Sequence, residues 1–228
     1  MRKKCALKLL TGVMVLTLAA ASADLAQAEG NQVFYRGGWV GMTSDRANEV
    51  FTDVNGGVAG VSGKTNDGGA GYYVGGGLDL LMHKNFLGFK GMSLLGEIGV
   101  EYKHLDSNTV VVAVPSTCRV AGITSCTVTT DRVQITMLTV DIAPKLKFMD
   151  GSAFRPWIIP IGLDFHVISP PSNSTTVLDI GVQFGAGAEY NFWGPLNLGI
   201  DARYHLASNQ TNTVNSYGTA GAYLGILY

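Results

Sequence analysis

The stretch DIGVQFGAGAEYNFWGPLNLGIDARYH, residues 179–205, decides the fold. Taken at alternate positions, residues 179–190 separate into a polar or glycine row and an apolar row. The first row is Asp179, Gly181, Gln183, Gly185, Gly187 and Glu189, and the second is Ile180, Val182, Phe184, Ala186, Ala188 and Tyr190. Residues 196–205 alternate in the same way after the turn sequence NFWGP. Such a period of two predicts two β-strands joined by a tight turn, each with two different faces.

Two kinds of β-barrel fit this hairpin. In a soluble barrel the apolar row fills the core and the polar row meets water, which gives no reason for so many glycines in the polar row. In a small membrane barrel the polar row is crowded into a narrow lumen, where glycines leave room for long charged neighbours, and the apolar row meets lipid. Tyr190, Phe192 and Trp193 gather at the turn, where an interfacial aromatic girdle would lie. The hairpin therefore favours the membrane barrel.

The N-terminus has the pattern of a secretory signal peptide. A basic start at residues 2–8 precedes an apolar run at residues 9–21, and Ala26-Gln27-Ala28 is a small-x-small cleavage site. We expect a signal peptide at residues 1–28, cleaved after Ala28, and one barrel domain at residues 29–228. The alternative is an uncleaved anchor helix, for which the apolar run is short. Cys5 precedes the apolar run, so it is not a lipoprotein-type cysteine and leaves with the signal.

Composition narrows the class of protein further. The signal holds four of the 16 basic residues and one of the 17 acidic residues, so the mature chain has 12 against 16, a net charge of −4 with His neutral. This balance argues against a nucleic-acid binder. No apolar stretch after the signal reaches the length of a spanning helix. A membrane protein built without such helices must be a closed β-barrel, because only closure satisfies every backbone group in lipid.

Eight segments carry the two-faced strand pattern, so the predicted fold is an all-β, eight-stranded antiparallel up-and-down transmembrane barrel. The segments are residues 35–43, 70–82, 93–104, 132–148, 154–167, 179–190, 196–205 and 217–228. In the fourth segment the alternation slips after Leu138, which we interpret as a β-bulge. Pro156 and Pro160 fit the fifth segment poorly, because neither can donate a ladder hydrogen bond. Long connections, as at 44–69 and 105–131, alternate with short ones, as at 149–153 and 191–195, and the short side is expected to be periplasmic.

The polar rows of these segments place a set of charged residues in the lumen. The predicted network is Arg36, Asp79, Glu97, Glu101, Lys103, Asp141, Lys145, Asp164, Glu189, Asp201 and Arg203, with Lys147, His166 and His205 in the same rows. An eight-stranded barrel is only wide enough to be filled by its own side chains, so these charges must pair. We expect Arg203 to pair either with an acid such as Glu189 on the preceding strand or with one on the eighth strand's side of the lumen, and the sequence does not fix which. The prediction is a salt-bridged plug, and an ion or proton path is the alternative.

Two cysteines remain after the signal. Cys118 and Cys126 flank the short polar segment RVAGITS, and in an exported protein such a pair most simply forms one disulfide. No His or further Cys lies nearby at metal-ligand spacing, so no metal site is expected. The glycines follow strand alternation and form no phosphate-binding loop, so no cofactor is expected.

The chain resembles the small outer-membrane β-barrels of Gram-negative bacteria, which include the OmpA transmembrane domain, opacity-type surface proteins and porin-like barrels. The resemblance covers the whole mature chain. It rests on the signal peptide, the eight strands, the sequences GAGAEYNF and GIDARYHL, and the final YLGILY. Leu224, Ile226 and Tyr228 are similar to the C-terminal signal that this family presents to the outer-membrane assembly machinery, with Tyr in place of the commoner Phe. The resemblance implies a monomer in the outer-membrane lipid, with a surface partner at its outer loops.

Function is less sharply defined by this pattern, because the fold carries adhesins, tethers, narrow channels and a few enzymes. Some barrels of this kind are lipid A deacylases that use a His and a Ser near the C-terminus. His205 and Ser208 are three apart, which places them on opposite faces of a regular strand, and no acid follows Asp201. We therefore expect no enzymatic activity and keep a lipid A-modifying hydrolase as a remote alternative. The predicted role is structural or surface-interactive, and the main alternative is a narrow channel for ions or small solutes.

Overall fold

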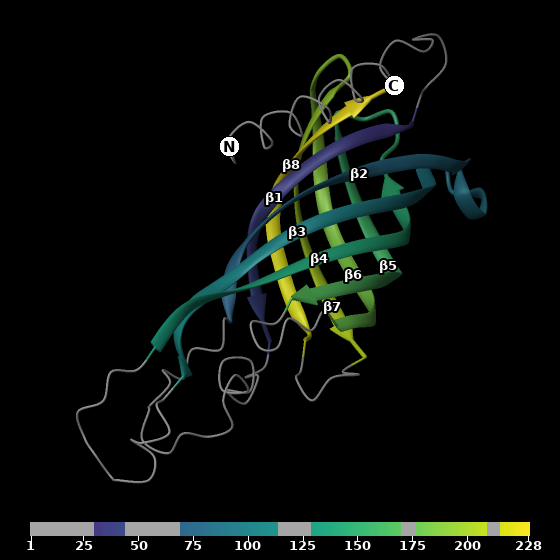
Figure 1. Ribbon diagram of the computed structural model, residues 1–228. Helices are drawn as coiled ribbons and strands as arrows, with labels where there is room; N and C mark the ends of the chain where they lie inside the picture. Colours follow the sequence, from purple (N-terminus) through teal and green to yellow (C-terminus); the bar gives the residue numbers. More distant parts are fainter. Residues whose placement is uncertain (1–29, 44–68, 114–128, 170–176, 209–214) are drawn as a thin grey trace, which may run out of the picture.

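The computed structural model describes residues 30–43, 69–113, 129–169, 177–208 and 215–228. Eight antiparallel strands form a closed barrel in which sequence neighbours pair and β8 pairs with β1 (Figure 1). The strands are β1 Gln32–Met42, β2 Ala70–Lys84, β3 Met92–Ala113, β4 Thr129–Phe148, β5 Phe154–Ser169, β6 Val177–Trp193, β7 Leu196–Ala207 and β8 Tyr217–Leu227, with a short 3-10 helix, η2 Phe86–Gly88, between β2 and β3. The predicted fold is confirmed.

The two ends of the barrel differ in their connections. One end of the barrel, which we name the short-turn end, contains the start of β1 and the end of β8. It also contains the short turns at residues 85–91, 149–153 and 194–195. The opposite end, the long-loop end, receives the connections through residues 44–68, 114–128, 170–176 and 209–214, which lie outside the described residues. The signal segment 1–28 and both Cys118 and Cys126 also lie outside them, so the cleavage site and the disulfide stay predictions.

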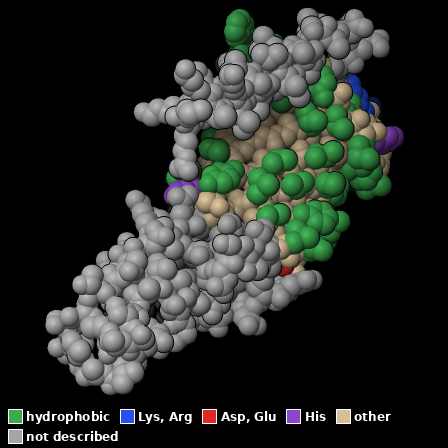
Figure 2. Space-filling view, viewed as in Figure 1, with side chains coloured by type: hydrophobic (Ala, Val, Ile, Leu, Met, Phe, Trp, Pro, Cys, Tyr) green, Lys and Arg blue, Asp and Glu red, His purple; other side chains and the backbone are tan. Residues whose placement is uncertain are grey.

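Side chains alternate between the interior and the outer wall, with the charged row inside. In β7, Asp201 and Arg203 are buried, whereas Ile200 is 66% exposed and Leu198 56% exposed. Figure 2 shows hydrophobic side chains spread over the outer wall. A charged interior and an apolar exterior suit a barrel whose wall faces lipid, because the hydrocarbon solvates the outer row and the lumen sequesters the charges.

Glycines of the inward row make room for large lumen side chains. A Cβ at Gly187 would lie 2.5 Å from Cζ2 of Trp157, and one at Gly99 would lie 2.5 Å from Oδ1 of Asp141. Both distances are below van der Waals contact, so the narrow lumen holds these large side chains only because the opposing residues have no Cβ.

The predicted slip in β4 is wrong. The register of β4 against β3 and β5 is continuous from residue 136 to 142, with Met137 buried and Leu138 exposed. The irregularity lies in β3 instead, where residues 105 and 106 stand opposite residue 135 alone. The alternation seemed to slip because Met137, an apolar residue, faces inward. It packs in an interior cluster that consists of Val40, Tyr73, Leu105, Met137, Ile168 and Tyr217.

A bulge in β5 accommodates its second proline. Ile159 pairs with Gly185 and Gly162 pairs with Gln183, so Pro160 and Ile161 together face one residue of β6. The missing N–H of Pro160 thus falls where the ladder is interrupted. The bulge also changes the parity of the strand: odd-numbered residues face inward before it, as Ile159 does, and even-numbered residues after it.

Candidate functional site

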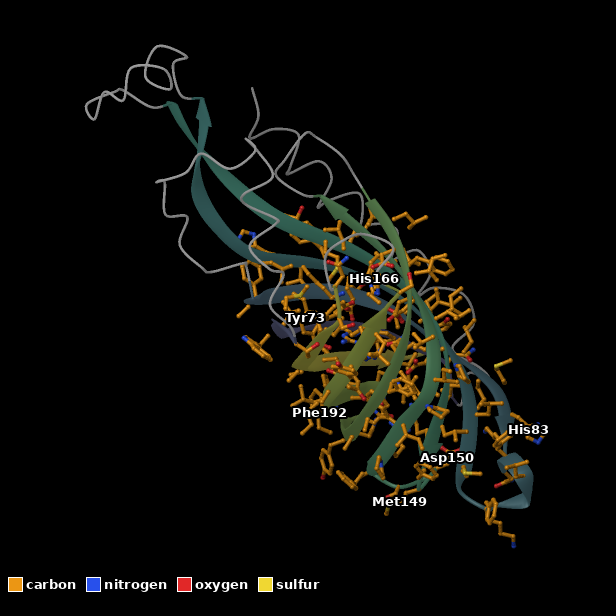
Figure 3. All side chains as sticks on the ribbon, turned by 90° about the horizontal axis from the view of Figure 1, so that it is seen from below. Tyr73, His83, Met149, Asp150, His166 and Phe192 are labelled. Carbon is orange, nitrogen blue, oxygen red and sulfur yellow. The ribbon has the colours of Figure 1, made fainter. Side chains whose placement is uncertain are left out.

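All eleven charged residues that the sequence predicts for the lumen lie inside the barrel, and each is at most 6% exposed. They come from strands β1 to β7, while β8 contributes Tyr217 and Tyr223 to the interior. Figure 3 shows side chains crowded inside the wall, with Tyr73 and His166 nearer the long-loop end than Met149 and Asp150. The lumen is therefore the candidate site, and its contacts fall into levels along the barrel axis.

Two arginines occupy the middle level. Arg36 Nη2 lies 2.9 Å from Glu101 Oε1, and its Nη1 lies 3.2 Å from Asp201 Oδ2. Arg203 Nε donates to the same Asp201 oxygen at 3.0 Å, and Arg203 Nη1 pairs with Glu97 Oε1. Planar guanidinium groups can hold two carboxylates at once, so this level is a continuous chain of ion pairs from β1 to β3 and β7.

Glu189, one of the two kinds of partner that the sequence left open for Arg203, does not pair with it; the acid that does is Glu97 of β3. Glu189 lies further towards the short-turn end, where Lys147 Nζ and Arg155 Nε are 2.9 and 3.0 Å from its Oε1. The hydroxyl of Tyr223 donates to Oε2 of Glu189 at 3.1 Å. The sequence does not reveal Arg155 as a lumen residue, because the prolines of β5 obscure which of its residues face inward. Glu189 therefore forms ion pairs with two basic side chains at this level.

Lys145 connects these two levels. Its Nζ lies 2.9 Å from Asp79 Oδ2 and 3.0 Å from Glu97 Oε2, and 4.3 Å from the ring centroid of Trp157. The ammonium is thus held by two carboxylates and by a cation–π contact. Around it packs an interior cluster of Phe34, Ala143, Trp157, Ile159 and Tyr223. Alternation already places Phe34, Ala143 and Tyr223 in inward rows. Trp157 and Ile159 could not be found from it, because they precede the bulge at which β5 changes parity.

Lys103 anchors the level nearest the long-loop end. Its Nζ lies 2.7 Å from Glu101 Oε2 and donates to Thr139 Oγ1 at 2.8 Å. Thr139 Oγ1 is also 3.2 Å from the hydroxyl of Tyr217 and 3.1 Å from His166 Nδ1. The polar groups here form one connected network, which orders side chains from β3, β4, β5 and β8.

Two carboxylates face each other beside this network. Asp141 of β4 and Asp164 of β5 are directly paired in register, and both are buried. Asp164 Oδ2 lies 2.7 Å from His205 Nδ1, whereas the nearest cation to Asp141 is Arg203, with Nη1 at 3.9 Å. His205 in turn stacks on Tyr217 with ring centroids 4.3 Å apart. Asp141 therefore has one distant cation, and the basic partners of Asp164 are imidazoles.

The side chains of the lumen are arranged as a plug. Tyr73, Trp157 and Tyr217 fill successive levels with at most 1% of their surface exposed, and charged pairs occupy the space between them. Buried pairs of this kind contribute little net stability compared with apolar packing, but each partner fixes the position of the other, and loss of one leaves a buried charge. The arrangement suits a closed, rigid barrel.

His205 and Ser208 have separate partners. His205 contacts Asp164 and Tyr217, while Ser208 Oγ donates to Asp179 Oδ1 at 2.6 Å. Their different partners give no support to a hydrolase arrangement. Among the described residues, no group of three or more His, Cys, Asp or Glu side chains is placed to hold a metal ion. Within the same part of the chain, no helix is long and apolar enough to cross a membrane.

The residues of the expected assembly signal lie in and just after β8. Leu224 and Ile226 are exposed on the outer wall, and Tyr228 follows the strand and donates its N–H to Asn31 O at 3.2 Å. Their recognition by the assembly machinery stays a prediction.

Neither a protein-family model nor the sequence of a curated protein matches this chain. Solved structures do. Neisserial surface protein A is 11% identical over 87% of this chain and 97% of its own, with a TM-score of 0.52. The N-terminal β-barrel domain of Pseudomonas aeruginosa OprF is 12% identical over 89% and 100%, with a TM-score of 0.45, and the outer membrane enzyme PagL is 10% identical over 86% and 98%, with a TM-score of 0.45. With its closed barrel of eight antiparallel strands, the chain has the fold of the small outer-membrane β-barrels.

Proposed function

We propose that the protein is an integral outer-membrane β-barrel with a structural or surface-interaction role, carried by its long-loop end rather than by its lumen. The observation that carries this proposal is the packing of the lumen. Arg36, Arg203 and Lys145 are each bound by two carboxylates, and buried aromatic rings lie between them. A solute path would require these pairs to separate, so the lumen supports a plug rather than a channel.

The long strands β3 and β4 support a role at the long-loop end. β2 pairs with β3 as far as residue 104, and β5 pairs with β4 as far as residue 136. β3 and β4 pair with each other further, to residues 113 and 129. The two strands therefore continue as a ribbon beyond the barrel wall, which Figure 1 shows extending towards the connection between them. A projecting ribbon offers backbone groups to a partner outside the membrane.

Electrophoresis tests the membrane location. We expect the protein to fractionate with the outer membrane and to migrate differently in boiled and unboiled detergent samples, because a closed barrel of paired strands resists detergent until it is heated. Recovery as a soluble periplasmic protein, with the same migration in both samples, would contradict the proposal.

Trypsin applied to intact cells tests the orientation. We expect cleavage after Arg46, Lys64 and Arg119, which the sequence assigns to outer connections, and protection of Lys84 and Lys90 at the short-turn end. Cells with a permeabilised outer membrane provide the control, in which Lys84 and Lys90 should also become accessible, since both are exposed. Cleavage at these lysines in intact cells would reverse the assigned orientation.

A disulfide between Cys118 and Cys126 is expected in the outer β3–β4 connection. Mass spectrometry of a non-reduced digest should find the two peptides linked. Replacing both cysteines by Ser should change the unfolding of the barrel little, because the bond closes a short loop already anchored by its strands. Free thiols in protein isolated from an oxidising medium would refute the linkage.

A further inference from the structure

The ionised side chains on the outer surface gather at one corner of the barrel. Among the residues whose side chains the structure describes (30–43, 69–105, 136–168, 178–208 and 215–228), the exposed Lys, Arg, Asp and Glu residues are Lys84, Lys90 and Asp150. Lys84 ends β2, Lys90 follows η2, and Asp150 lies in the adjacent β4–β5 turn. Figure 2 shows blue and purple side chains at the edge of the wall from which the η2 turn projects in Figure 1. Exposed basic charge is thus concentrated where the wall meets the short-turn end.

Large apolar side chains are exposed at the same place. Leu87 is 73% exposed and Phe89 63% exposed, and η2 contains no buried residue. Met82 and Met149 are exposed beside them. The outward row of β2, which includes the exposed Leu80, leads directly onto this surface. We name this surface the η2 corner, defined by Met82, Lys84, Leu87, Phe89, Lys90 and Met149.

Hydrogen bonds hold the η2 corner in a fixed shape. Asn85 Oδ1 accepts a hydrogen bond from the N–H of Gly91 at 3.2 Å, and Gly91 O accepts one from the N–H of Asp150 at 3.0 Å. Ser93 Oγ donates to Asp150 Oδ2 at 2.8 Å, so the β2–β3 and β4–β5 turns are joined by both backbone and side chain. The exposed apolar groups are therefore carried on a built scaffold.

All the non-glycine residues with left-handed backbone in the described ranges lie in this same scaffold. Asn85, Leu87 and Met149 have φ angles of 53°, 54° and 58°, and no other non-glycine residue in the described ranges has positive φ. This conformation is disfavoured for Leu and Met, and it persists where the surrounding structure imposes it, often at sites of binding. Here it presents two apolar side chains, Leu87 and Met149, to the outside instead of to the core.

We propose that the η2 corner inserts into the headgroup layer of the leaflet at the short-turn end and binds anionic phospholipid headgroups. Leu87 and Phe89 would enter the boundary with the acyl chains, while Lys84 and Lys90 extend their ammonium groups to the phosphates. The inference rests on the proposed membrane location. Charge complementarity selects the lipid, because two lysines outweigh the single Asp150, whose carboxylate already accepts a hydrogen bond from Ser93.

The aromatic residues at this end agree with an interfacial position. Tyr190, Phe192 and Trp193 are all exposed around the neighbouring β6–β7 turn. Amphipathic rings favour the level of the headgroups, so the short-turn end lies where phosphate groups are available to the lysines.

A nitroxide attached at residue 87 tests the proposal. The full chain with Cys5, Cys118 and Cys126 replaced by Ser and with Leu87→Cys is labelled and refolded into vesicles of phosphatidylcholine, with or without about one third phosphatidylglycerol, a fraction that places many anionic headgroups around each lysine. Power saturation compares the collision rate with oxygen, which concentrates in lipid, and with a neutral nickel chelate, which stays in water. Thr43→Cys at the opposite end, also exposed, is the matched control.

With phosphatidylglycerol present, we expect the label at residue 87 to collide more often with oxygen than with the nickel chelate. The label at residue 43 should show the reverse. Adding Lys84→Gln and Lys90→Gln should weaken partition into the headgroup layer by about fivefold per lysine and remove the difference between the two lipid mixtures. Nickel access at residue 87 equal to that at residue 43, with the unboiled sample still migrating as a folded barrel, would overturn the inference and leave the proposed function intact. Spectral broadening from coupling between labels would also overturn it, in favour of a second copy of the chain. A sample that never folds in vesicles would contradict the proposed function itself.

Discussion

Replacing Arg203 by Ala should lower the free energy of unfolding of the lipid-embedded barrel by about 3–5 kcal/mol. Arg203 is buried and contacts Asp201 and Glu97 on two different strands. Its loss leaves both carboxylates without one of their cations in a space that admits little water, which is the costly case for a buried ion pair. Urea titration of the refolded protein in vesicles, followed by tryptophan fluorescence, measures the change.

The neighbouring residue provides the control. Ala202 is exposed on the outer wall, opposite Ala186 of β6 and Ala220 of β8. Ala202→Leu should be nearly neutral, whereas Ala202→Arg should cost about 2–4 kcal/mol near the bilayer midplane, because hydrocarbon cannot solvate the guanidinium. If Ala202→Arg is harmless and Arg203→Leu stabilises the barrel, the two faces are exchanged and a soluble barrel becomes the better description.

The second large effect on stability is a difference between two buried acids, Glu97 and Asp141, which the sequence places equally in the lumen. Glu97→Gln should destabilise the barrel by about 3–5 kcal/mol, because Glu97 serves both Lys145 and Arg203. Asp141→Asn should be neutral or stabilising, because Asp141 stands directly opposite Asp164 and its nearest cation, Arg203, is 3.9 Å away. The amide removes a like-charge contact and loses only a weak attraction.

Urea midpoints of the two variants, measured side by side in the same vesicles, decide between specific pairing and general packing. Equal losses at positions 97 and 141 would mean that the lumen responds to total charge and not to the individual pairs. A larger loss for Asp141→Asn than for Glu97→Gln would contradict the assignment of partners.

The alternation of residues 179–205 was enough to predict the hairpin and the burial of Asp201 and Arg203, and it favoured the membrane barrel that the rest of the sequence then supported. It could not identify the partner of Arg203. Strand tilt and register bring Arg203 of β7 across the lumen to Glu97 of β3, whereas the sequence left open Glu189 on β6 and an acid on the side of β8. Contacts across a barrel depend on the stagger between all its strands, which no single strand encodes.

Two further residues show where the pattern fails. Met137 faces inward because the lumen near the long-loop end contains an apolar cluster, so an apolar residue in the inward row imitated a slip of the strand. Pro160 marks a real bulge, and the parity change that it causes turns Trp157 inward. Alternation predicts which residues share a face, but a bulge or an apolar patch in the lumen can be located only when the neighbouring strand is known.

Single-channel recording of the purified protein in planar bilayers tests the closed lumen most directly. Because paired charges and the buried rings of Tyr73, Trp157 and Tyr217 fill the interior, the account predicts insertion without discrete conductance steps. Insertion can be verified on the same preparation by its heat-dependent migration. Stable, reproducible unit conductance from the folded barrel would contradict the plug and establish the narrow channel in its place.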